Sequence, residues 1–238
     1  MAFGDFVRCL LHFACTCMCR LGVDIMQQLI GLKASSKHLW DTVNATSEQI
    51  DDRARTVKVY SDCVYYNYHR LGMSLMFKPT SGYKLSANAA EASLNLDQLI
   101  LDGIDIFNAI IDDANPNSHK TANKAYQPFH RLPIEIHLSP TSPSANNISE
   151  TSKLSAIPTT FLFETSTTGK DLVSALGEPS RKGGGGGPSV GSIAIWCDWT
   201  RHGIMVEFGG PDSIGPKAWE SGKDARWAIL SLYEPNVK

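Results

Sequence analysis

Short runs rich in β-branched and aromatic residues dominate the chain from residue 56 onward, and they constrain its fold more than any other feature. The runs are Thr56–Tyr60, Cys63–Tyr68, Gly72–Lys78, Leu99–Phe107, Pro133–Leu138, Ser192–Trp199, Ile204–Phe208 and Ala228–Tyr233. Such runs are typical of β-strands. Only one convincing helical stretch interrupts them, Gly169–Leu176, which follows Thr167 and Thr168 and stops at Gly177. With so few crossover helices, we expect a mainly antiparallel sheet with one packed helix.

The first 55 residues have a different pattern. From residue 4 to about residue 52 the apolar residues recur at helical spacing, with one stripe at Leu21, Ile25, Leu29 and Leu32 and a second at Leu39, Trp40, Val43 and Ile50. We expect two helices joined over Gly31–Ser36, with Ser35 or Ser36 capping the second. The fold class is therefore α+β with an N-terminal helical segment.

This contrast suggests two parts, a helical segment over residues 1–55 and an α+β domain over residues 56–238. Polar inserts separate the strands of the second part, and the one from Ser139 to Thr159 is rich in Ser and Pro. Such a segment has too little apolar material to pack a core, so we expect it to be disordered.

Charge and cysteine usage narrow the class of protein. Lys and Arg number 22 against 24 Asp and Glu, a formal net charge of −2 that disfavours a dedicated nucleic-acid binder. The six cysteines do not form the pattern of a secreted disulfide framework. The N-terminal apolar stretch is too short to span a bilayer. We expect a cytoplasmic protein, peripheral on membranes if it meets them at all.

Four cysteines cluster near the N-terminus, and Cys15, Cys17 and Cys19 lie beside Leu10, Leu11 and Phe13. Clustered cytosolic thiols next to an amphipathic helix are candidates for acylation, and two acyl chains give lasting membrane anchoring. A zinc site is disfavoured because only His12 is near to complete the ligands. A packing or poorly structured N-terminus is the remaining interpretation.

A second unusual stretch is Arg181 and Lys182 followed by the glycines Gly183, Gly184 and Gly185. Consecutive glycine amides next to cations can hold an anion. A nucleotide-binding loop needs a strand before the glycines and a helix after them, and here the order is reversed. Two interpretations remain, a flexible connector or a loop that contacts an anionic headgroup or a partner.

Several side chains could act as acid, base or nucleophile, but no motif joins them. They are Asp62, His69, Asp102, Asp105, His130, His137, Cys197 and Glu207. We assign no catalytic residue, metal or cofactor. The rival hypothesis is a small cytosolic hydrolase or transferase that uses His69, His137 or Cys197. Asp102 and Asp105 lie in an apolar strand, one of them near an expected turn at Gly103, and they are too close in sequence and on opposite strand faces to form a carboxylate dyad.

Alternation predicts the two faces of the last hairpin, Ser192–Trp199 with Ile204–Phe208. We expect the core face to carry Ile193, Ile195, Cys197 and Trp199 with Ile204, Val206 and Phe208. Trp196, Asp198 and Glu207 would then share the opposite, more polar face.

Several short motifs occur in a characteristic order. Tyr65-Tyr66-Asn67-Tyr68-His69-Arg70-Leu71-Gly72 comes first, Leu176-Gly177-Glu178-Pro179 follows, and Gly191-Ser192 comes later. This succession resembles the C-terminal part of the phagophore assembly factor family, an uncharacterised-protein family of eukaryotes, in a fungal-like form. The resemblance covers about Tyr60 to Tyr233; residues 1–55 and the run of glycines have no counterpart in it.

The resemblance implies a non-enzymatic role in autophagy. It implies association with a WD40 β-propeller protein and recruitment to phosphoinositide-bearing membranes. Our leading hypothesis is therefore a non-catalytic adaptor or scaffold protein that acts through protein and membrane association.

Overall fold

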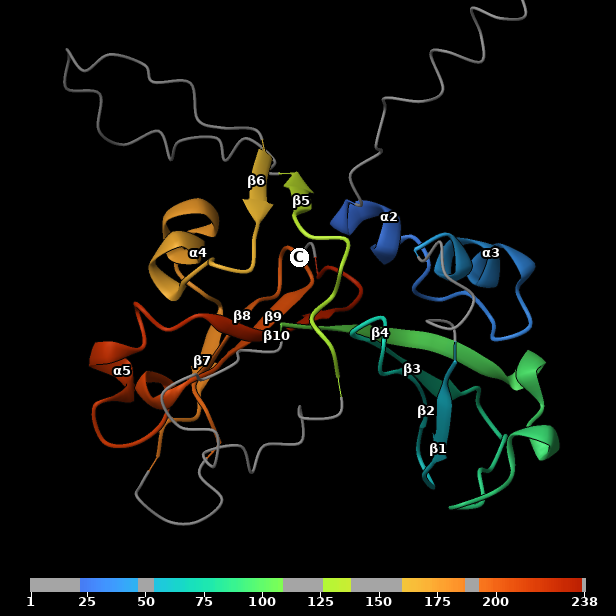
Figure 1. Cartoon of the computed structure of the whole chain (residues 1–238). Helices are drawn as coiled ribbons and strands as arrows, with labels where there is room; N and C mark the ends of the chain where they lie inside the picture. The colour runs from blue at the N-terminus through green and yellow to red at the C-terminus, as the bar shows by residue number, and fades with distance from the viewer. Residues whose placement is uncertain (1–21, 47–53, 109–125, 138–159, 187–192, 237–238) are drawn as a thin grey trace, which may run out of the picture.

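An eight-stranded antiparallel sheet forms the centre of the protein (Figure 1). The computed structural model describes residues 22–46, 54–108, 126–137, 160–186 and 193–236. The sheet has the order β1-β2-β3-β4-β10-β9-β8-β7. Its strands are β1 (Thr56–Val59), β2 (Val64–Tyr68), β3 (Met73–Pro79), β4 (Leu99–Phe107), β7 (Arg181–Gly183), β8 (Trp196–Trp199), β9 (Ile204–Phe208) and β10 (Trp227–Leu232). The predicted α+β class with a mainly antiparallel sheet is confirmed.

One face of this sheet is covered by a second layer. In Figure 1 the helices α2 (Val23–Gln27), α3 (Lys37–Ala45) and α4 (Gly169–Leu176) lie above the sheet, together with a two-stranded sheet of β5 (Ile134–His137) and β6 (Thr160–Phe163). The short helix α5 (Ala218–Ser221) lies at the β7 end. Three 3-10 turns complete the elements: η2 (Glu91–Ser93), η3 (Leu96–Gln98) and η5 (Pro211–Ser213).

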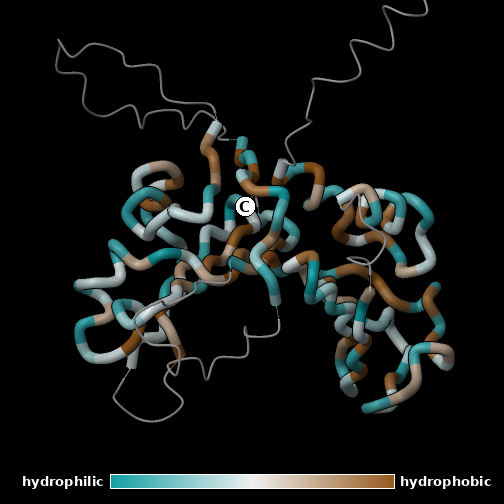
Figure 2. The backbone as a smooth tube through the Cα atoms, viewed as in Figure 1, coloured by the Kyte–Doolittle hydropathy of each residue, from teal (hydrophilic) through white to brown (hydrophobic). Residues whose placement is uncertain are grey.

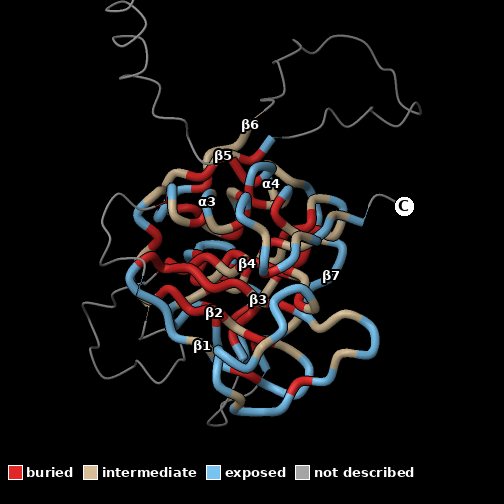
Figure 3. The backbone as a smooth tube through the Cα atoms, turned by 90° about the vertical axis from the view of Figure 1, so that its right-hand side faces the viewer, coloured by how far each residue is buried: buried red, intermediate tan, exposed pale blue. Residues whose placement is uncertain are grey.

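The apolar core lies between these two layers. Directly paired residues of six neighbouring strands form one buried row across the sheet: Tyr66, Leu75, Ile104, Leu232, Ile204 and Trp199. Burying such a row removes a large apolar area from water, which is the main favourable term in folding. Figure 2 shows the hydrophobic residues along the central strands, and Figure 3 shows the same strands buried beneath exposed loops.

The N-terminal helices belong to this core. Val23, Met26, Leu39 and Val43 are all buried in the same apolar cluster as the strands. The Ser36 Oγ accepts from the Leu39 N–H, which confirms the predicted cap of α3. The described part of residues 1–55 is thus packed on the sheet rather than forming a separate unit.

The opposite face of the sheet carries a row of residues that is polar except at Met205. Strand pairing places Thr56, Asn67, Ser74, Asp105, Ser231, Met205, Asp198 and Arg181 next to one another, one from each strand. Because successive residues of a strand point to opposite faces, this row lies between the apolar positions of the same strands. We call these eight residues the polar row.

Three local predictions are corrected. Gly103 does not form a turn but lies within β4, where a Cβ would be 3.4 Å from the Leu232 carbonyl oxygen. The segments Thr160–Phe163 and Arg181–Gly183 are strands that the sequence patterns did not predict. The helix α5 was also not predicted, because its four residues are too few to show a helical period.

None of the helices in the described ranges is both long and apolar enough to cross a bilayer.

Candidate functional site

The side chains considered for catalysis do not meet in one place. His69 follows β2, while Cys197 lies on β8, and four strands separate β2 from β8 in the sheet. At the usual strand spacing this separation is about 24 Å. His137 is on β5, exposed, and its Nε2 lies 3.8 Å from Asp24 Oδ2. The residues that the structure describes contain no group of three or more His, Cys, Asp or Glu that could hold a metal ion.

Four of these groups are buried or have a close polar partner. Burial raises the pKa of Cys197 to about 11, so its thiol stays protonated at neutral pH. Burial and the charge of Lys58 lower the pKa of His69, and its Nε2 is 3.0 Å from Thr56 Oγ1. The Nε2 of His130 lies 3.0 Å from the Thr46 carbonyl oxygen. Asp102 is in an ion pair with Lys78 at 2.7 Å.

Two carboxyl groups on the polar face of the sheet have raised pKa values. Burial raises the pKa of Asp105, although a hydrogen bond from Ser231 Oγ at 2.6 Å favours its charged form. Burial also raises the pKa of Glu207, and the charge of Asp105 adds to this effect. As predicted, Glu207 shares its face with Trp196, which is its direct partner on β8. The two carboxyl groups lie on strands separated by β10.

The two faces of the last hairpin agree with the prediction except in the burial of Ile193 and Asp198. Ile195, Cys197, Trp199 and Val206 are buried in the core, whereas Ile193 is 66% exposed. Asp198 lies on the predicted polar face but is fully buried.

Asp198 forms hydrogen bonds with two side chains that are distant from it in the sequence, Arg181 and Tyr233. Arg181 donates to its Oδ2 from Nε at 2.9 Å and from Nη2 at 2.5 Å, and the Tyr233 hydroxyl donates to its Oδ1. Burial and the bond to Asp198 raise the pKa of Tyr233. The guanidinium of Arg181, predicted to contact an anion or a partner, is therefore engaged within the protein.

The glycines after Lys182 are held in close contact with the sheet. A Cβ on Gly183 would lie 2.6 Å from the Trp196 ring, and one on Gly184 would lie 2.1 Å from the Ala194 carbonyl oxygen. Gly184 and Gly185 have φ of +83° and +76°, values that other residues rarely adopt. The Gly185 N–H donates to the Ile193 carbonyl at 2.8 Å. In the structure Gly183, Gly184 and Gly185 therefore pack against the sheet.

This packing presents an exposed apolar corner at the β7 end of the sheet. Trp219 is 46% exposed and Ile214 is 40% exposed. The Lys182 Nζ lies 5.7 Å from the centre of the Trp219 ring, within cation–π range. A Cβ on Gly185 would be 3.4 Å from Trp219 Nε1, which shows how closely the glycine segment approaches α5. We call Lys182, Ile193, Ile214 and Trp219 the Trp219 corner.

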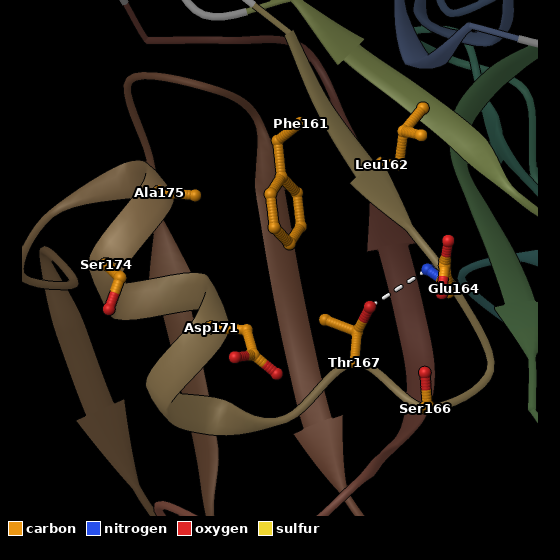
Figure 4. A pocket seen from close by; sticks show the side chains of 8 residues that line it. All are labelled: Phe161, Leu162, Glu164, Ser166, Thr167, Asp171, Ser174 and Ala175. Atoms are coloured by element: carbon orange, nitrogen blue, oxygen red, sulfur yellow. Dashed lines mark hydrogen bonds between the residues drawn. The ribbon is translucent and has the colours of Figure 1, made fainter. Parts of the chain in front are cut away.

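A second feature is an open pocket of about 400 Å³ between α4 and β6 (Figure 4). We call it the α4–β6 groove. It is lined by Phe161, Leu162, Glu164, Ser166, Thr167, Asp171, Ser174 and Ala175. The lining combines two carboxylates and three hydroxyls with the apolar side chains of Phe161, Leu162 and Ala175. No sequence pattern pointed to this groove, because β6 was not predicted as a strand.

The local fold positions the groove's acidic side chains. The Glu164 N–H donates to Thr167 Oγ1 at 2.9 Å, and the Glu164 carbonyl accepts from Trp227 Nε1 at 2.7 Å. Asp171 accepts from the Thr168 N–H at 2.9 Å and from its hydroxyl at 2.6 Å. These bonds lower the pKa of Asp171 and keep it ionised.

The predicted acylation sites Cys15, Cys17 and Cys19 lie outside the described residues, as does the whole insert over residues 139–159. Comparison of the chain with protein-family models, with curated proteins and with solved structures finds no match.

Proposed function

We propose that this protein is a non-catalytic adaptor or scaffold that associates with a protein partner and with an anionic membrane surface. The resemblance to the phagophore assembly factor family supplies the setting, which is autophagy. It also supplies the partners, a WD40 β-propeller protein and a phosphoinositide-bearing membrane.

The observation that carries the proposal is the Trp219 corner. Tryptophan side chains favour the boundary between lipid and water, apolar side chains such as isoleucine favour the acyl layer, and nearby lysines favour anionic lipids. Trp219, Ile214 and Ile193 all expose at least 40% of their surface in this corner. The ammonium group of Lys182 lies next to the Trp219 indole ring. The close packing of the glycine segment gives the corner a rigid base.

Acidic side chains also lie near the Trp219 corner, and their charge affects how strongly we expect it to bind anionic lipids. Asp212 and Glu220 are exposed on η5 and α5, near Lys182 and Lys217. The positive charge of the corner is therefore partly offset. We expect membrane affinity to depend more on Trp219 than on Lys182, and to fall only moderately with added salt.

Vesicle co-flotation tests this proposal. The protein should float with phosphatidylcholine vesicles that contain a phosphoinositide, and Trp219→Ala should weaken binding about tenfold, the equivalent of ~1.4 kcal/mol. Tyr60→Ala is a matched control, because Tyr60 is 47% exposed at the β1–β2 turn. No flotation, or equal flotation of the two variants, would contradict membrane contact through this corner.

One observation favours the rival enzyme hypothesis. Asp105 and Glu207 both have raised pKa values on one face of the sheet, and raised carboxyl pKa values are common among general acids. A hydrolase or transferase would lose turnover in Glu207→Ala while the variant remained folded. The adaptor would bind its partner and vesicles normally with that substitution.

A further inference from the structure

We propose that the α4–β6 groove binds an extended peptide segment of a partner protein, which adds a strand to the free edge of β6 and places a Lys or Arg side chain between Glu164 and Asp171. This inference concerns a surface that the proposed membrane contact does not use. It deepens the adaptor function and rests on that function for the role of the partner.

The first support is the position of the groove at a strand edge. Phe161 and Leu162 are consecutive residues of β6, and both line the groove. Because consecutive side chains of a strand point to opposite faces, a cavity reached by both lies alongside the edge of the strand. In its two-stranded sheet β6 pairs only with β5, so this edge is free among the described residues.

The second support is a comparison of strand edges. Proteins protect exposed edges from other chains with charged residues, especially lysine, or with very short strands. The outer strand β1 carries Lys58, and the three-residue β7 carries Arg181 and Lys182. β6 is as short as β1, with four residues, but its sequence Thr-Phe-Leu-Phe has no charged residue. The edge is therefore suited to main-chain pairing with another segment.

The same small sheet already accepts a chain segment at its other edge. Gly22 forms an isolated parallel bridge with Glu135 of β5. β5 therefore lies between an added segment and β6, and an added strand on β6 would extend the same sheet toward α4. Strand addition of this kind is a common form of peptide recognition.

The negative charge of the groove favours an occupant with a basic side chain. Its eight lining residues include Glu164 and Asp171 and no basic side chain. Glu164 has no ion pair among the described residues, while the neighbouring Lys170 is already paired with Asp224 at 3.1 Å. A cationic side chain between the two carboxylates would be favoured by both.

The apolar part of the lining fits the remainder of such a segment. Phe161, Leu162 and Ala175 are half-buried, and in Figure 4 Phe161 and Ala175 point into the space between α4 and β6, whereas Leu162 projects from the other side of the strand. Phe161 is fixed by an edge-to-face contact with Phe163, with ring centres 6.2 Å apart. An extended peptide that alternates aliphatic and basic residues would therefore bury its aliphatic side chains here, while its backbone pairs with β6.

The test uses fluorescence anisotropy with the full chain and a labelled octapeptide that alternates Val and Arg. A Val–Glu peptide is the charge control. A Val–Arg peptide with N-methyl groups at alternate positions is the backbone control. We expect only the unmodified Val–Arg peptide to bind. Glu164→Lys and Ala175→Trp should weaken binding at least tenfold, whereas Glu178→Lys makes the same charge change at an exposed site after α4 and should leave binding unchanged.

The outcomes separate this inference from the proposed function. Glu164→Lys should float with vesicles as the unaltered protein does, and Trp219→Ala should bind the peptide normally. Absence of binding by the Val–Arg peptide, equal binding by the Val–Glu peptide, or retained binding in both groove variants would overturn the groove assignment. Binding of the N-methylated peptide or of free arginine amide with equal affinity would overturn strand addition.

Discussion

Arg181 holds the fully buried carboxylate of Asp198 through two hydrogen bonds to a single oxygen, Oδ2, at 2.9 and 2.5 Å. The contact joins β7, a strand of three residues, to β8 at the edge of the sheet. A buried carboxylate without partners is costly, so this contact explains why so short a strand is kept in place.

Arg181→Ala should therefore destabilise the fold more than an ordinary surface change. It removes two of the three donors to Asp198 and leaves only the Tyr233 hydroxyl. We expect a lower urea midpoint than in Arg201→Ala, which removes an exposed arginine from the turn after β8. Arg181→Lys should lie between the two, because lysine keeps the charge but loses the fork geometry. Equal midpoints for the two alanine variants would contradict this role.

The glycine segment gives a second prediction with an internal control. Gly184→Ala places a Cβ 2.1 Å from a backbone oxygen at a φ of +83°, whereas nothing lies within 4 Å of a Cβ on Gly186. We expect Gly184→Ala to lower the free energy of unfolding by at least about 2 kcal/mol. Gly186→Ala should change it by less than about 0.5 kcal/mol. Chemical denaturation of both variants tests this, and equal small effects would show that the segment is not packed.

Glu207 gives a prediction on pH. Its pKa in the folded protein is above the ordinary value of 4.5 because of burial and the charge of Asp105. Between the ordinary and the raised value the folded state binds more protons than the unfolded state, so this group's contribution to stability is lost as pH rises. Glu207→Gln should therefore stabilise the protein at neutral pH, and the gain should shrink toward pH 4.5.

The measurement is the urea midpoint of the two proteins across this pH range. Glu178→Gln, an exposed site, is the control and should show no such trend. A gain for Glu207→Gln that grows as pH falls would contradict the assigned direction of the pKa shift.

The two faces of the last hairpin give a fourth prediction. Val206 is fully buried and Ile193 is 66% exposed, although alternation placed both on the core face. Val206→Asp would bury an unpaired carboxylate and should abolish the cooperative unfolding transition. Ile193→Asp should leave that transition nearly unchanged. Circular dichroism during thermal unfolding distinguishes the two, and a folded Val206→Asp variant would contradict the position of the core.

Sequence patterns predicted the elements that have a strong period or a clear boundary. β4 and α4 have the predicted bounds, and Ser36 caps α3 as expected. β7 could not be predicted, because Arg-Lys-Gly has no strand propensity and the strand depends on pairing with β8. Tertiary contacts also decide the burial of Asp198, whose partners Arg181 and Tyr233 are 17 and 35 residues away in the chain.

The candidate sites were harder to predict from the sequence, because they too depend on tertiary contacts. The sequence marks the segment from Arg181 to Gly185 as unusual, but its neighbour Trp219 comes from a helix too short to detect. The α4–β6 groove exists only because β6 pairs with β5 across a long insert. Residues that become neighbours through pairing far apart in the chain leave no local pattern.

Affinity purification of the tagged protein from its native cells tests the adaptor function most directly. We expect recurrent recovery of a WD40 β-propeller protein, with the unaltered chain and with Glu207→Ala alike. Failure to recover any propeller protein across replicates, or its recovery equally with an untagged control, would contradict the adaptor function.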